Sequence, residues 1–502
     1  MIKSGISTAL SLTMLVALSA CAPTPPEPAP TSSKRHYGDV AFEPCTLSAA
    51  AGLGNVAAQC AQFEVAEDRT QPEGRKIQLA LAWLPATEEG SASDDPVVFF
   101  AGGPGQSALS TWPQLDPAFS QVRRQRHVLL VDQRGTGKSN LLQCEDQGET
   151  AESSGDAAAH AIAALAGRCA QAVAAHADPR FYTTTDAVAD LEQIRQALGV
   201  ATFNLVGVSY GTRMAQKYAG AHPERVRSLV LDGVAPNDLV IGGEFARTFE
   251  DALALQAEQC HRVASCKERY PADPRRQLDT LVARLKQAPV SVDYRDPTTA
   301  QVKQTTVNSD TVTGLAFLFS YLPQTAALLP LVLDEASQGR YEPLASLHQL
   351  MSRNVGDTMA RGMQWSVVCA EDADRLGSQD TNGTLLGPEL AKMFFAACSQ
   401  WPHGSRPADF TTALQSTAPA LLISGEIDPV TPPRYGDQVA EGLSQGRHVV
   451  LKGQGHGNLA TGCMPRLLGQ FVEAADAKSL DTSCLDSLDY VPPFTSFNGW
   501  EP

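Results

Sequence analysis

Four short apolar segments, each leading directly into a glycine turn, constrain the fold of this chain more than any other feature. They read VVFFAGGPG, HVLLVDQRGTG, FNLVGVSYG and VRSLVLDGV, beginning at residues 97, 127, 203 and 226. Continuous apolar runs of this length are typical of strands buried on both faces of a parallel sheet. Between the second and third runs, apolar residues at 188, 191, 194 and 198 follow helical spacing up to Gly199. The alternation predicts an α/β fold with a mostly parallel central sheet.

The alternation of strand-like and helical segments stops in the middle of the chain. Between residues 241 and 416 strand-like runs become rare, and segments such as EFARTFEDALALQAEQC and RRQLDTLVARLKQ have a helical pattern. Strand-and-turn segments resume at APALLISGEIDP and RHVVLKGQGHG. We therefore expect one α/β core in two parts, residues 41–240 and 417–502, with a large α-helical cap insertion at 241–416.

The N-terminal segment indicates export rather than a part of the fold. Lys3 precedes an apolar stretch that is too short to cross a bilayer, and the segment LSAC ending at Cys21 resembles a bacterial lipobox. We predict a signal peptide at 1–20, lipidation of Cys21 and a proline-rich linker at 21–40. Ordinary signal cleavage, with Cys21 incidental, is the alternative. Because Ala22 rather than aspartate follows the cysteine, we expect an outer-membrane lipoprotein facing the periplasm.

An even number of cysteines remains when Cys21 is set aside. Ten cysteines in an exported chain favour a disulfide framework, and the Cys and His spacings of a zinc site do not occur. Other pairings stay open, but pairing sequential neighbours closes five short loops. The disulfides expected on this basis are Cys45–Cys60, Cys144–Cys169, Cys260–Cys266, Cys369–Cys398 and Cys463–Cys484.

Charge and motif content argue against two classes of ligand. The chain has 39 basic and 55 acidic residues, and the resulting net charge of −16 opposes binding to nucleic acid phosphates. The GTGKS segment at Gly135 resembles the end of a nucleotide-binding P-loop, but Asp132 stands where that motif needs its first glycine. We therefore expect no nucleic acid partner, no cofactor and no metal.

Three motifs supply the parts of a serine hydrolase. GVSYG at 207–211 is a G-x-S-x-G turn, which would lift the hydroxyl of Ser209 clear of the sheet. A serine nucleophile needs a base and an orienting carboxylate, which in this fold follow in the order Ser, Asp, His. Asp428 follows the strand-like segment ALLIS, and His456 lies in a glycine-flanked loop after the next one. Glu426 is the main rival for the acid.

The tetrahedral intermediate of such an enzyme also needs preorganised N–H donors. One donor is expected from Tyr210, the residue after the nucleophile. The other is expected from the glycine turn AGGPG, either from Gly103 or, as the second choice, from Gly102.

In their order and spacing, GGPGQS, DQRGTGKS, GVSYG, GEIDPVTPP and GQGHG resemble the prolyl-aminopeptidase and tripeptidyl-aminopeptidase branch of the α/β-hydrolases. The resemblance covers nearly the whole mature chain, including a tripeptidyl-aminopeptidase-like C-terminal region. It implies an α/β-hydrolase fold in which DQRGTGKS is a loop beside the active site. It also implies that acidic cap residues hold the free α-ammonium of a peptide, for which Glu371 and then Asp372 are the candidates. Ala101 replaces the histidine of the prolyl group, so specificity for N-terminal proline does not follow.

Together these features predict an exported serine aminopeptidase that hydrolyses peptide substrates through an acyl-enzyme intermediate. A carboxylesterase or lipase with the same triad is the first alternative, because a fold does not fix a substrate. A non-catalytic binding protein that retains the scaffold is the second.

Overall fold

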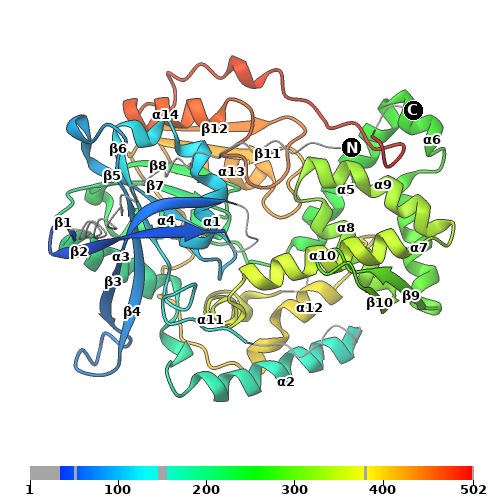
Figure 1. Ribbon diagram of the computed structural model, residues 1–502, viewed down its shortest axis with the longest axis horizontal. Helices are drawn as coiled ribbons and strands as arrows, with labels where there is room; N and C mark the ends of the chain where they lie inside the picture. Colours follow the sequence, from blue (N-terminus) through cyan, green and yellow to red (C-terminus); the bar gives the residue numbers. More distant parts are fainter. Residues whose placement is uncertain (1–33, 50–53, 145–154, 378–380, 500–502) are drawn as a thin grey trace, which may run out of the picture. The chain divides into compact units, whose positions relative to one another are not determined.

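A ten-stranded sheet forms the centre of the structure, a computed structural model that describes residues 34–49, 54–144, 155–377 and 381–499 (Figure 1). The predicted signal peptide and Cys21 lie outside these residues, as does most of the predicted linker. The strand order is β1-β2-β3-β4-β6-β5-β7-β8-β11-β12. The strands are β1 (Arg35–Tyr37), β2 (Val40–Ser48), β3 (Asn55–Ala66), β4 (Lys76–Leu84), β5 (Ser93–Phe100), β6 (Arg126–Val131), β7 (Phe203–Val208), β8 (Val226–Asp232), β11 (Ala420–Gly425) and β12 (Gly446–Leu451).

The sheet is mostly parallel, as the sequence predicts. Strands β6, β5, β7, β8, β11 and β12 pair in parallel, and the pairs formed by β1 to β4, including β4 with β6, are antiparallel. Alternate residues of a strand point to opposite faces, and in β5 they enter two different cores. Val98 and Phe100 pack in the core that contains Leu191 and Met214, whereas Val97 and Phe99 pack in a second core.

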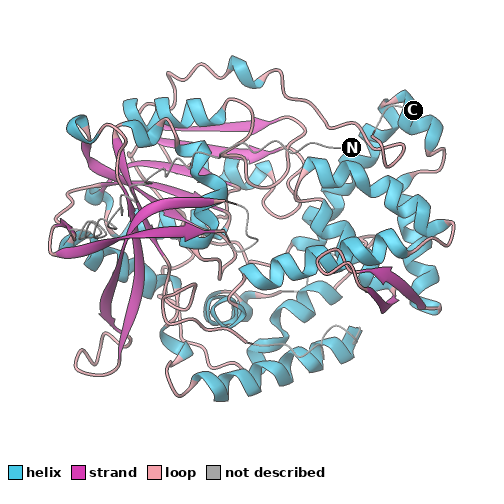
Figure 2. Cartoon of the chain, viewed as in Figure 1, coloured by secondary structure: helices cyan, strands magenta, loops and turns pink. Residues whose placement is uncertain are grey.

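Helices cover both faces of this sheet (Figure 2). One core receives apolar residues from α2 (Gly155–Val173), α3 (Thr184–Ala197) and α4 (Tyr210–Ala221). The other receives apolar residues from α1 (Ala108–Leu115) and α14 (Met464–Ala474). Burial on both faces explains why the central strands read as unbroken apolar runs.

Between β8 and β11 the chain forms mainly helices. These helices are α5 (Phe245–Arg262), α6 (Ala264–Arg269), α7 (Pro274–Gln287), α8 (Ser309–Phe319), α9 (Pro323–Ser337), α10 (Glu342–Thr358), α11 (Arg361–Glu371) and α12 (Glu389–Phe395). Residues of α5, α7, α8, α9 and α10 share a further apolar core. The sequence prediction missed an antiparallel hairpin within this region, β9 (Val290–Arg295) with β10 (Val302–Val307). The apolar and polar residues of VSVDYR alternate, which is a strand pattern. None of the helices in the described ranges is both long and apolar enough to span a bilayer.

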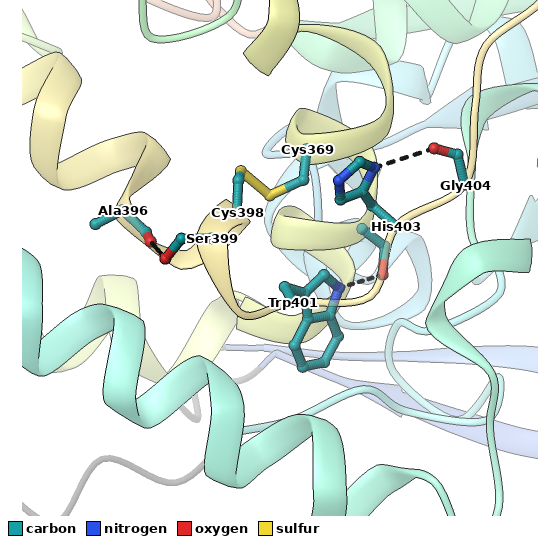
Figure 3. Close-up of a disulfide and its surroundings, with 8 residues drawn as sticks. Cys369, Ala396, Cys398, Ser399, Trp401, His403 and Gly404 are labelled. Carbon is teal, nitrogen blue, oxygen red and sulfur yellow. Dashed lines mark hydrogen bonds between the residues drawn. A yellow bond between two sulfur atoms is a disulfide. The ribbon is translucent and has the colours of Figure 1, made fainter.

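The five disulfides in the structure are the five that the sequence predicts. Cys45–Cys60 joins β2 to β3, and Cys463–Cys484 joins the start of α14 to the C-terminal segment. Figure 3 shows Cys369–Cys398, which joins α11 to the 3₁₀ segment after α12, with Trp401 beside it. The buried indole of Trp401 donates a hydrogen bond to Ser366 Oγ at 3.0 Å. The link therefore holds two helices of the region between β8 and β11 together.

The loop DQRGTGKS is built around a buried carboxylate. Asp132 Oδ1 accepts hydrogen bonds from Ser107 Oγ and Leu109 N, at 2.7 and 3.0 Å, and its Oδ2 accepts from Lys138 N at 3.1 Å. A side chain at Gly137 would lie only 2.0 Å from Asp132 Oδ2. The Asp132 carboxylate thus occupies the centre of the loop, where a P-loop would hold a phosphate.

Replacing both Cys463 and Cys484 with serine should lower the free energy of unfolding by about 3 kcal/mol, because their link closes a 21-residue separation in the unfolded chain. The matched control replaces Cys260 and Cys266, whose link spans a separation of only 6 and should contribute about 2 kcal/mol. Urea unfolding followed by circular dichroism measures both. A larger loss from the short link would contradict the chain-entropy explanation.

Candidate active site

Ser209 occupies a strained turn between β7 and α4. Its backbone lies at φ +57° and ψ −126°, a conformation that is rare for a residue with a side chain. The two flanking glycines have no room for a side chain: a Cβ would lie 2.3 Å from Gly211 O at Gly207, and 2.3 Å from Phe100 O at Gly211. The G-x-S-x-G pattern is therefore required by packing. It places Ser209 at the carboxyl end of the parallel strands.

Asp428 and His456 form a close pair after the neighbouring strands β11 and β12. Asp428 Oδ2 lies 2.7 Å from His456 Nδ1, and its Oδ1 accepts the N–H groups of Val430 and Thr431 at 2.9 and 2.8 Å. Since a carboxylate accepts, Nδ1 carries the proton and Nε2 is left as the base. The rival Glu426 contacts a different part of this loop, where its Oε2 accepts the N–H of Gly453 at 2.9 Å.

The chain at the end of β8 contacts both the Ser209 turn and His456. The N–H of Ser209 donates to the carbonyl oxygen of Asp232 at 2.8 Å. The next residue, Gly233, faces His456, because a Cβ there would lie 2.9 Å from His456 Cε1. Ser209, Asp428 and His456 thus all follow strands of the parallel sheet at its carboxyl end, where a triad of this fold would lie.

The pKa values of this pair are coupled. Burial alone would lower the pKa of His456, but the charge and hydrogen bond of Asp428 outweigh it and raise the pKa above the usual value. For Asp428, burial acts in the opposite sense, yet the facing imidazole and the backbone N–H groups hold its pKa below the ordinary range. The arrangement favours an ionised Asp428 that stabilises a protonated His456.

The glycine turn after β5 lies against the nucleophile. A Cβ at Gly102 would lie 3.0 Å from Ser209 Cβ, and the following Gly103 has φ +110°. In the described part of the chain, the backbone N–H groups of Gly103 and Tyr210 donate to no protein atom. Both remain candidates for oxyanion donors, with Gly102 as the second choice for the first.

Residues from the region between β8 and β11 contact this site directly. Tyr321, between α8 and α9, accepts the N–H of His456 through its carbonyl at 2.7 Å and sets its ring edge-on to the imidazole at 5.4 Å. Phe317 meets Tyr321 at 5.5 Å and Phe245 at 5.9 Å, and Phe394 lies 5.9 Å from Phe245. These four partly exposed rings form a chain of aromatic contacts that begins at His456.

The two predicted amine-binding carboxylates lie in the interior and have no exposed surface. Glu371 accepts hydrogen bonds from Thr184 N and Thr184 Oγ1, at 2.7 and 2.9 Å, and that hydroxyl also bonds to Tyr210 Oη at 2.7 Å. Asp372 pairs with Arg213 at 3.1 Å and with Arg375 at 2.5 Å. Desolvation raises the pKa of Glu371 to about 7, because Arg213, 3.8 Å away, only partly compensates it.

Sequence reasoning missed three residues that contact the predicted triad. Thr431 Oγ1 donates to Asp428 Oδ2 at 2.7 Å and lies 3.0 Å from His456 Nδ1. Tyr321 covers the imidazole, and Asp232 joins two catalytic loops. An acidic residue at the end of an apolar strand, as in LVLDG, is the only cue to Asp232. No sequence pattern marks the other two.

Comparison with known proteins identifies the family. Residues 95–462 match the model of the alpha/beta hydrolase fold family, and this span exceeds half of the chain. The protein therefore belongs to the α/β-hydrolases, in agreement with the fold and the strand-to-helix turn at Ser209.

Several relatives of this chain are named as peptidases. The chain is 26% identical to serine protease Hip1 of Mycobacterium tuberculosis over 425 residues, which cover 77% of this chain and 79% of the relative. It is 29% identical to the tripeptidyl aminopeptidase of Streptomyces lividans over 195 residues, 35% of each chain. It is 30% identical to the proline iminopeptidase of Neisseria gonorrhoeae over 148 residues, 29% of this chain and 35% of the relative. The prediction of a serine hydrolase of the peptidase type is confirmed.

Asp428→Asn should lower kcat about 10⁴-fold, because an amide at this position favours the wrong imidazole tautomer and cannot stabilise the protonated histidine. Glu426→Gln is the matched control two residues away. It removes one charge from the same loop and should change kcat less than tenfold. Steady-state kinetics on one chromogenic substrate compares the two variants. Equal losses would contradict the assignment of Asp428.

The acid limb of the pH profile of kcat/KM should reflect the ionisation of His456. Since a protonated imidazole cannot accept the serine proton, kcat/KM should fall as pH decreases, with an apparent pKa above the ordinary 6.5 of histidine. Rates measured from pH 5 to 9 test this expectation. An acid limb at or below 6.5 would contradict the raised pKa of His456.

Proposed function

We propose that this protein is an exported, lipid-anchored serine aminopeptidase that releases residues or short peptides from free peptide N-termini. In the proposed reaction, Ser209 Oγ attacks the scissile carbonyl carbon while His456 Nε2 accepts its proton. The N–H groups of Gly103 and Tyr210 hold the oxyanion. The C–N bond then breaks, His456 gives the proton to the leaving amine, and water hydrolyses the acyl-enzyme.

The proposed preference for the ends of peptide substrates over their internal bonds rests on how the catalytic residues are covered. Tyr321 lies on the imidazole of His456, and its backbone carbonyl holds the N–H of that residue. A second contact comes from Ala360, whose N–H donates to Gly105 O in the glycine turn at 2.9 Å. Segments between β8 and β11 thus contact both the His456 loop and the glycine turn after β5. A covered site favours short peptides or free termini over an internal bond of a folded protein, and one relative is named a tripeptidyl aminopeptidase and another a proline iminopeptidase.

The substrate ammonium in this proposal pairs with Glu371 rather than with Asp372. Asp372 already has two arginine partners, whereas the one ion pair of Glu371 within the described residues is with Arg213 at 3.8 Å, and its pKa is raised as described above. A second cation beside Glu371 would offset the free-energy cost of burying its charged form. The carboxyl of Glu371 is closed to solvent, so an ammonium would have to replace one of its hydrogen bonds to Thr184.

Export and anchoring rest on the N-terminal sequence and the disulfides. Five disulfides are typical of an oxidising compartment such as the periplasm. With the lipobox-like segment ending at Cys21, they support an acylated protein in the outer membrane, facing the periplasm.

A panel of substrates tests the proposed activity against the esterase alternative. Alanyl, prolyl and Ala-Ala-Pro anilides with a free amine should be cleaved, whereas the same anilides with an acetylated amine should react at least tenfold more slowly. Short-chain p-nitrophenyl esters are the comparison, and Ser209→Ala is the blank. Cleavage of esters alone, or equal rates for free and acetylated anilides, would exclude an aminopeptidase and leave a general esterase.

Two neighbouring variants test the amine site. Glu371→Gln should raise KM for free-amine anilides about tenfold or more with little change in kcat, because a charge-assisted hydrogen bond is lost on binding. Asp372→Asn breaks a buried ion pair instead, so it should lower the melting temperature while the ratio of free to acetylated rates stays the same. An unchanged ratio in Glu371→Gln would place the amine site elsewhere.

A further inference from the structure

Asp232, at the end of β8, connects the nucleophile to the loop of the catalytic base. Its backbone carbonyl accepts the N–H of Ser209 at 2.8 Å. Its side chain reaches the loop after His456, where Oδ2 accepts the N–H groups of Asn458 and Leu459 at 2.5 and 2.9 Å. One residue thus fixes the positions of two catalytic elements that lie more than two hundred residues apart in the sequence.

The other oxygen of this carboxyl has no partner. Asp232 is 0% exposed, and Oδ1 makes no hydrogen bond within the described part of the chain. The titratable groups with the largest effect on it are His456, from the loop after β12, and Asp428, from the loop after β11. Burial raises the pKa of Asp232 to about 6, so the carboxyl is mostly ionised at pH 7.

Two N–H donors alone do not need a charged acceptor, since an amide oxygen or a backbone carbonyl would satisfy them. An ionised carboxylate in this position carries a desolvation cost that must have a compensation. The charge of Asp232 raises the pKa of His456, in addition to the larger effect of Asp428. The third group on the imidazole, Tyr321, is a phenol whose own pKa is raised by burial and which therefore stays neutral.

We propose that Asp232 is a positioning residue with an electrostatic role in the reaction. It holds the His456 loop against the Ser209 turn, and as a second buried anion it stabilises the imidazolium that forms when the serine proton moves to Nε2. The same anion helps to keep the imidazole of His456 protonated until the leaving amine takes the proton. This inference rests on the proposed triad and not on the choice of substrate.

Asp232→Asn tests the charge separately from the geometry, because the amide oxygen can still accept both N–H groups. We expect kcat/KM to fall about tenfold or more, and the acid limb of its pH profile to move to lower pH as the imidazolium loses one stabilising anion. Either an anilide or an ester can serve, since both require the same base. An unchanged acid limb would overturn the electrostatic role.

Asp132→Asn is the matched control. Asp132 is also a buried carboxylate that accepts two backbone N–H groups, with a pKa raised by burial, but its partners lie in the DQRGTGKS loop and at the start of α1. This substitution should lower stability without moving the acid limb. An equal shift in both variants would show a general effect of lost buried charge and would contradict a specific role for Asp232.

A measurement on the unaltered protein covers the case in which Asp232→Asn does not fold. The proton on His456 Nδ1, shared with Asp428, should give a low-field NMR signal that is absent from His456→Ala. Its chemical shift should show a separate inflection near pH 6, when Asp232 ionises beside it. A signal that follows a single ionisation between pH 4 and 9 would overturn the proposal.

Discussion

The site depends on the contact between the ends of β7 and β8. The strained turn at Ser209 is held from one side by the hydrogen bond between its N–H and the carbonyl of Asp232. It is held from the other side by Gly211, which lies so close to the end of β5 that a Cβ would be 2.3 Å from Phe100 O. Backbone strain persists only where the surrounding structure fixes it. The parallel sheet supplies that support, and the turn in return presents the serine hydroxyl at the sheet edge.

Around this turn, buried carboxylates organise the loops. Asp132 fills the DQRGTGKS loop and accepts an N–H at the start of α1, directly after the glycine turn that faces Ser209. Asp428 holds the imidazole, and Asp232 holds the chain just after it. Asp132 and Asp428 follow strands of the same sheet and Asp232 ends one, so all three carboxylates lie where the parallel strands end. Residues between β8 and β11 then contact these loops, chiefly through Tyr321, which lies on the imidazole of His456.

Much of this arrangement follows from the sequence, since the strands are continuous apolar runs and the triad motifs follow strand ends. The cysteines pair with their neighbours because each pair closes a short loop. What the sequence could not reveal depends on distant partners. The burial of Glu371 depends on Thr184 and Arg213, far away in the chain. The role of Asp232 depends on backbone N–H groups at residues 458 and 459, which carry no sequence signature. The hairpin β9–β10 was missed because its strands lie among helices and do not form the continuous apolar runs of the central strands.

The proposed reaction requires that Ser209 be a nucleophile activated by His456 and Asp428. A fluorophosphonate forms a stable covalent adduct with an activated serine, so mass spectrometry of the protein after reaction with this reagent is the decisive measurement. We expect one adduct per chain, located at Ser209 by peptide mapping and absent from His456→Ala at short times. An unmodified protein, or an adduct on a different serine, would rule out Ser209 as the nucleophile.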